Sequence, residues 1–217
     1  AGRFALAARV LLAAVSLAAC GGGGGGGEQS AVTGTTKRLT IAVIPKGTTH
    51  EFWKAIHAGA EQAGQELAAA GDTVTLIWKG PLREDDRDQQ VQVVEGFTSQ
   101  HVDGMVLAPL DVRALSRPVE EAQAAGVPTV IIDSGLESDA IVSYVATDNT
   151  KGGELAADRL GELLGGKGKV LVLRLQEGSA STTAREDGFL AQLAAKYPGI
   201  TVVSSNQYAG ATRETAK

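Results

Sequence analysis

From residue 38 onward, short apolar runs alternate with amphipathic segments, and this alternation constrains the fold more than any other feature of the chain. In the segment 52–70, the apolar residues recur at helical spacing, namely at Phe52, Ile56, Ala60, Ala63 and Leu67. The intervening apolar runs show no polar alternation, as in strands buried on both faces. The sequence therefore predicts an α/β fold, with doubly wound parallel sheets covered by helices on both faces.

The same reasoning assigns each element a range. Strands are expected at 39–44, 73–78, 105–108, 128–132, 141–146, 170–175 and 200–204. Helices are expected at 52–70, 86–100, 112–125, 151–164 and 183–197, with a further helix beginning at 211 and a bend at Pro118. We expect an N-terminal lobe over 38–147 and a C-terminal lobe over 148–217. Because two strands are fewer than the five or so of an average sheet, the second lobe is expected to be incomplete in this chain.

The first 37 residues follow a different pattern. Arg3 and Arg9 precede an Ala/Leu-rich apolar run, Cys20 follows it, and glycines occupy 21–27. A basic start, a short apolar stretch and small residues at its end are the parts of a secretory signal. The run is also shorter than the ~20 residues that a spanning helix needs. Residues 17–20 resemble a bacterial lipobox, which implies that Cys20 is lipidated and becomes the first residue of the mature protein.

We therefore expect a signal peptide over 1–20, a flexible Gly-rich tether over 21–37, and an exported, lipid-anchored protein in the bacterial envelope. The alternative is a buried cysteine in an N-terminal helix, but a run of glycines follows that helix directly and leaves it nothing to pack on.

Composition excludes several functions. The net charge is −5 without a basic block, which argues against nucleic-acid binding. The chain's single cysteine cannot form an intrachain disulfide or pair with a histidine inside the fold. His50, His57 and His101 lack metal-site spacing, and the glycine-rich stretches lack the P-loop pattern. We expect no metal, no cofactor and no catalytic activity.

A ligand of such a fold binds beyond the carboxyl ends of the parallel strands. The loops in question are 45–51, 79–85, 108–111, 133–139 and 176–182. The loop 133–139 opens with Asp133, and the loop 176–182 is rich in small hydroxyl residues.

Several motifs occur in an order typical of one family. They lie at 49–54 (THEFWK), 102–107 (VDGMVL), 125–128 (AGVP), 146–149 (ATDN), 165–170 (GGKGKV) and 185–189 (REDGF). In this order they resemble the ribose/galactose-type periplasmic sugar-binding proteins, from about Leu39 to Lys217. Sugar-responsive repressors share the order, but they begin with a DNA-binding helix-turn-helix where this chain begins with an export signal.

The resemblance implies a type 1 two-lobe fold that closes on a sugar or polyol. It implies a monomeric solute-binding lipoprotein that delivers its ligand to an ABC permease in the membrane. Hinge motion would occur near Thr147, Asp148 and Asn149. A component of a sugar sensor or chemotaxis system would share this fold, and an exported enzyme on a similar scaffold is a further alternative.

In the first lobe, the resemblance implies that Phe52 and Trp53 form an aromatic wall against the sugar, although both could equally be core residues. Trp53 lies about 100° from the apolar face, so we expect that the core does not require it. His50 stands where many relatives have Asn, and it is either a ligand contact or a solvated loop residue. Thr48 and Glu51 have the spacing of a capping box.

Asp133 would accept charge-assisted hydrogen bonds from sugar hydroxyls, with Ser134 beside it as a further ligand contact, although Asp-Ser-Gly is also turn chemistry. In the second lobe, the resemblance implies that Arg185 and Thr183 contact the ligand, because they align with two positions, two residues apart, where the family often has arginine. We expect Asp148 and Asn149 to be hinge and helix-cap residues.

Two departures from the ribose-type pattern bear on the ligand. Ala108 replaces an Asn, and Ser134 replaces an Arg beside the strand-four aspartate. Both changes shorten the hydrogen-bonding reach of the pocket, while Trp78 and Lys79 add bulk and a cation. We therefore expect a different or larger polyol than a pentose bound in the ribose manner.

Overall fold

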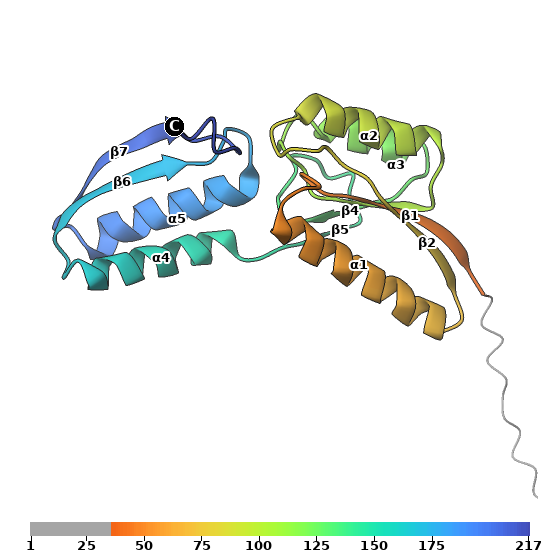
Figure 1. Ribbon diagram of the computed structural model, residues 1–217, viewed down its shortest axis with the longest axis horizontal. Coiled ribbons are helices and arrows are strands. Elements are labelled where there is room, and N and C mark those ends of the chain that lie inside the picture. Colours follow the sequence, from red (N-terminus) through yellow and green to blue (C-terminus); the bar gives the residue numbers. More distant parts are fainter. Residues whose placement is uncertain (1–35) are drawn as a thin grey trace, which may run out of the picture. The chain divides into compact units, whose positions relative to one another are not determined.

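The computed structural model describes residues 36–217 (Figure 1). The expected signal peptide, Cys20 and nearly all of the expected tether lie outside the described residues. None of the helices within 36–217 is long and apolar enough to cross a bilayer.

The first sheet has five strands in the order β2-β1-β3-β4-β5, and every neighbouring pair is parallel. The strands are β1 (Arg38–Ile44), β2 (Thr73–Trp78), β3 (Gly104–Leu107), β4 (Thr129–Ile132) and β5 (Ser143–Val145). Helices α1 (Glu51–Ala69), α2 (Arg87–Ser99) and α3 (Ser116–Ala124) connect the strands from β1 to β4. The expected parallel α/β arrangement is confirmed, and all carboxyl ends of the strands therefore lie at one edge.

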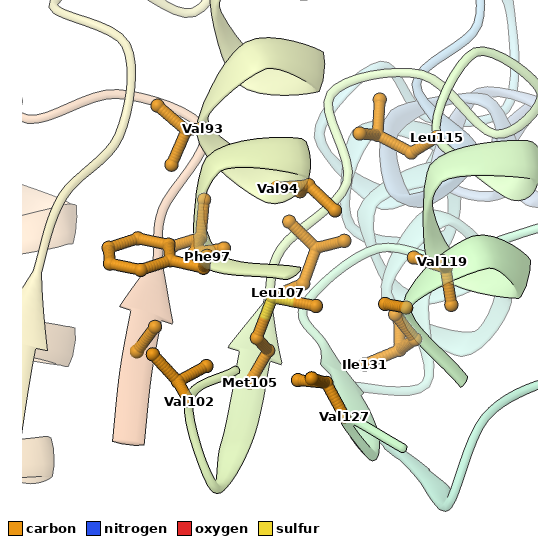
Figure 2. Close-up of a cluster of buried hydrophobic side chains, with 13 residues drawn as sticks. Val93, Val94, Phe97, Val102, Met105, Leu107, Leu115, Val119, Val127 and Ile131 are labelled. Carbon is orange, nitrogen blue, oxygen red and sulfur yellow. The ribbon is translucent and has the colours of Figure 1, made fainter. Parts of the chain in front are cut away.

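The main hydrophobic core lies between this sheet and helices α2 and α3. Figure 2 shows Phe97 and Val94 of α2 and Val119 of α3 in one cluster with Met105 and Leu107 of β3. Each of these side chains is at most 3% exposed. Burying side chains of this size contributes roughly 1.5–3 kcal/mol each. The packing fixes the sheet against the helices, so the loops at the carboxyl edge start from fixed points.

The remaining elements form a second group, with a parallel sheet of β6 (Gly168–Arg174) and β7 (Ile200–Tyr208) and helices α4 (Asn149–Leu163) and α5 (Ala180–Lys196). Figure 1 shows α4 and α5 lying side by side. Glycines permit this approach, because a Cβ at Gly153 would collide with the backbone of Arg185 and one at Gly188 with that of Thr150.

Three details differ from the sequence expectations. Helix α3 begins at Ser116 rather than 112, because the carboxylate of Asp111 accepts the amides of Arg113 and Ala114 in a turn. Pro118 therefore lies in the first turn, where its missing N–H costs no intrahelical bond and no bend is required. Strand β7 continues to Tyr208, and residues 211–217 form a turn closed by Thr212 and Thr215, so the helix expected there is wrong.

The expected cap of the fourth helix is confirmed. The side chain of Asp148 accepts a 2.9 Å hydrogen bond from the amide of Lys151, which satisfies one of the free N–H groups at the start of α4.

Candidate functional site

Asp133 directly follows β4 at the carboxyl edge, and its backbone is strained. Its φ of 63° lies in the left-handed region, which non-glycine residues rarely adopt. A 3.0 Å hydrogen bond from its amide to Val145 O in β5 holds the backbone there. Strained residues of this kind cluster at ligand sites, where the surrounding structure over-determines them.

The loop after β1 brings Lys46 to Asp133. The Nζ atom of Lys46 lies 3.2 Å from Oδ2 of Asp133, and the Lys46 side chain is 5% exposed. The same Nζ donates to Ser179 Oγ at 3.3 Å and to Ser181 Oγ at 3.2 Å. Burial lowers the pKa of Lys46 below its ordinary value, while the charge and hydrogen bond of Asp133 oppose this shift.

Lys46 was not among the residues expected at the site. A signal for its location was present, because Lys46 lies in the loop directly after the first predicted strand and therefore at the carboxyl edge.

A buried glutamine fixes the loop that carries Lys46. Gln90 of α2 is 0% exposed, and its Nε2 donates to Pro45 O and to Ala108 O. Its Oε1 accepts the amide of Leu110. One side chain thus ties the loop after β1 to the loop after β3.

The N-terminus of α5 contacts these loops directly. Ser134 is fully buried, and its Oγ accepts the amide of Ser181 at 3.1 Å. Ser179, the N-cap residue of α5, makes no side-chain cap of its own. The loop after β4 therefore supplies an acceptor that the helix start lacks.

A second bond joins the loop after β3 to the same region. The amide of Val112 donates to Gly178 O at 2.9 Å. Gly178 has a φ of 84°, and a Cβ there would collide with the carboxylate of Asp111. Only glycine fits this close approach.

The aromatic pair is arranged differently from the expectation. Trp53 is 1% exposed, and its Nε1–H donates to Oε1 of Glu84 at 2.7 Å. The rings of Trp53 and Phe52 meet edge to face, with 4.9 Å between their centroids. The expectation that Trp53 lies off the packed part of α1 is wrong, because Glu84 in the loop 79–85 reaches its indole. Phe52, which was assigned to the apolar face, is instead 47% exposed.

His50 caps α1. Its Nδ1 accepts the amide of Phe52 at 3.1 Å, and the residue itself is exposed. The expected capping box is wrong, because Thr48 donates to Pro81 O and Glu51 pairs with Lys54.

The two expected contacts on α5 have different environments. Arg185 is exposed and makes no ion pair within residues 36–217, and its charge acts on Lys46. Thr183 lines a cavity of about 970 Å³ together with Arg87, Asp111 and Thr150. Of the seven expected ligand contacts, Thr183 is the one that lines this cavity. The structure thus brings Asp133 and Ser134 together with Lys46 and the start of α5, and places Thr183 on a separate cavity wall.

The assembled groups suit hydroxyl recognition. The part-exposed carboxylate of Asp133 offers an acceptor, and the exposed guanidinium of Arg185 offers donors. Within residues 36–217, no group of three His, Cys, Asp or Glu side chains is placed to hold a metal ion.

Comparison with known proteins identifies the family of the chain. The family model described as "Periplasmic binding protein domain" matches residues 41–217. The chain is 32% identical over 173 residues to the ribose import binding protein of Bacillus subtilis, covering 80% of this chain and 54% of the relative. It is also 32% identical over 183 residues to the D-ribose/D-allose-binding protein of Pseudomonas aeruginosa, covering 82% and 55%.

Solved structures give the same result. A carbohydrate transporter solute-binding protein from Agrobacterium radiobacter, in complex with D-arabinose, matches with a TM-score of 0.72 at 36% identity. That match covers 79% of this chain and 58% of the solved one. The periplasmic component of a sugar transport system from Hahella chejuensis matches with a TM-score of 0.75 at 32% identity, covering 81% and 62%.

The chain spans about half the length of the curated relatives it matches. Its α/β architecture with parallel sheets is that of the type 1 periplasmic binding proteins, as the motifs indicated. The chain belongs to the family of the periplasmic binding protein domain.

Proposed function

We propose that this protein is the extracytoplasmic solute-binding component of an ABC importer and that it binds a sugar or polyol between two lobes. The first lobe comprises 38–147, and residues from 148 onward belong to the second. The observation that carries the proposal is the carboxylate of Asp133, a residue with a strained backbone at the carboxyl edge of the sheet, beside the start of α5.

The proposed ligand contacts follow from this placement. Asp133 accepts ligand hydroxyls, exposed Phe52 packs on an apolar sugar face, and exposed Arg185 donates from α5. His50 and Thr183 contribute secondary polar contacts. Trp53 and Ser134 support the site, Trp53 through its edge contact with Phe52 and Ser134 through its bond to Ser181.

Relatives support the ligand class. The names of similar proteins include ribose-, xylitol-, allose- and apiose-binding components, and one solved neighbour holds D-fucose. These are all neutral polyhydroxylated molecules. Lobe closure around such a ligand would use Thr147, Asp148 and Asn149 as the hinge, and the closed monomer would be recognised by a membrane permease.

We further propose that export and anchoring depend on Cys20. Each buried lipid CH₂ contributes about 0.8 kcal/mol, so stable attachment needs more than one acyl chain. The variant Cys20→Ser should yield protein without lipid, and mass spectrometry of the membrane fraction measures this. Acylated Cys20→Ser protein would rule out the lipobox.

The ligand itself can be identified directly. The protein is purified under native conditions, and the small molecule released on denaturation is analysed by mass spectrometry. We expect a neutral sugar or polyol that binds again by calorimetry and remains chemically unchanged after incubation. A protein that binds no neutral sugar or polyol, or that converts one, contradicts the proposal.

A further inference from the structure

The ammonium group of Lys46 is the most deeply buried charge at the carboxyl edge. An ammonium has three N–H donors, and those of Lys46 have three acceptors, on Asp133, Ser179 and Ser181. Burying a charged ammonium group costs free energy unless an opposite charge lies beside it. The carboxylate of Asp133 provides that charge.

The pairing leaves Asp133 with one oxygen for a ligand. Oδ2 faces Lys46, whereas Oδ1 has no hydrogen-bond partner within residues 36–217, and the Asp133 side chain is 20% exposed. Lys46 thus holds one end of the carboxylate in place while the other end is available to a hydroxyl donor.

The charges around this pair are balanced. Glu84 and Arg185 both act on Lys46, with opposite signs, and Asp133 neutralises it. Counted with the pair itself, two cationic and two anionic side chains balance, so an anionic ligand would meet no net positive side-chain charge.

We propose that Lys46 is the positioning and selectivity residue of this site. It orients Asp133 and keeps the pair neutral, so the site accepts uncharged polyols and sugars and rejects the corresponding sugar acids. This inference rests on the proposed function, because it assigns a ligand class to the same site.

The alternative role for Lys46 is purely structural, in joining the loop after β1 to α5. That role predicts lower stability when Lys46 is replaced, but no change in the discrimination between neutral and acidic ligands. A measurement of discrimination therefore separates the two roles.

The test uses calorimetry with three neutral probes, D-ribose, D-arabinose and xylitol, each paired with its aldonate (ribonate, arabinonate, xylonate). The variants are Lys46→Met, Asp133→Asn and the double variant. The double variant leaves no unpaired charge of this pair, so it remains interpretable even if a single variant fails to fold.

For a neutral probe that the wild type binds, Lys46→Met should lower the affinity at least about tenfold, because Asp133 loses its orientation. Asp133→Asn frees the charge of Lys46, so this variant should bind the aldonate at least about tenfold more tightly than the double variant does. The matched control is the exposed pair of Lys54 and Glu51 on α1. The variant Lys54→Met should change neither the affinity for the neutral probe nor that for its aldonate.

Two results separate the claims. Neutral probes that bind equally well to wild type and Lys46→Met, or aldonates that bind equally to Asp133→Asn and the double variant, overturn the role of Lys46 alone. A folded wild type that binds neither these probes nor any other neutral sugar or polyol contradicts the proposed function, and the role of Lys46 with it.

Discussion

The hydroxyl oxygen of Ser134 accepts the backbone amide of Ser181 at 3.1 Å, although the two residues are 47 positions apart in the chain. The N-terminus of α5 is the positive end of its dipole, where a cation such as Lys46 is unfavourable by itself. The carboxylate of Asp133 compensates for this cation, so the loops after β1 and β4 and the start of α5 form one bonded cluster.

Replacing Ser134 by alanine should remove the acceptor for a buried amide of Ser181. The free energy of unfolding should fall by about 1 kcal/mol, as for loss of a helix N-cap. Urea denaturation measures this. The control is Ser99→Ala, an exposed serine that bonds only within its own helix, and it should change stability by less than about 0.5 kcal/mol. Equal stability of the Ser134 and Ser99 variants would show that the cap contributes nothing.

Replacing Trp53 by alanine should destabilise the fold, because the side chain is 1% exposed and hydrogen-bonded to Glu84. Large-to-small replacements of buried aromatic residues cost about 3–5 kcal/mol. The variant Trp53→Phe keeps the ring contact with Phe52 and should lose much less. Thermal unfolding followed by circular dichroism compares the two, and a Trp53→Ala protein as stable as wild type would contradict the packing described.

Asp111 should make stability depend on pH. Burial alone would raise its pKa, but hydrogen bonds from the amides of Ala114 and Arg113 and from Arg87 outweigh burial and hold the pKa below its ordinary value. A carboxyl whose pKa is lowered by folding adds stability above its unfolded pKa, and this contribution disappears as the pH falls through the folded pKa.

The stability difference between wild type and Asp111→Asn should therefore be largest near neutral pH and shrink from about pH 5 to about pH 3. Urea denaturation across this range measures it. Exposed Asp139, which makes no ion pair or hydrogen bond within residues 36–217, supplies the control variant Asp139→Asn. A difference for Asp111→Asn that stays constant over the range would show that the observed hydrogen bonds do not stabilise the charged form.

The sequence predicted the parallel sheet because its signal is local. Apolar runs such as 39–44 and the helical spacing of Ile56, Ala60 and Ala63 depend only on near neighbours in the chain. The cap of α4 by Asp148 was likewise predictable, since a cap involves residues three apart.

The details that sequence reasoning missed depend on distant contacts. Trp53 is packed because Glu84, 31 residues away, reaches its indole. Helical periodicity cannot show this. Lys46 has a partner more than 130 residues away at the start of α5. Helix α3 starts later than expected because Asp111 accepts two amides in a turn. Such contacts become visible only once the loops are placed in space.

The most direct test of the account is the calorimetric affinity of Asp133→Ala for a sugar or polyol that the wild type binds. The variant loses charge-assisted hydrogen bonds worth about 1.5–3 kcal/mol. The affinity for the ligand should therefore fall by a factor of roughly ten to more than a hundred. The melting temperature should remain high enough for the variant to be folded during the measurement. A folded Asp133→Ala protein that binds the ligand as tightly as wild type would show that the carboxyl edge at β4 is not the binding site.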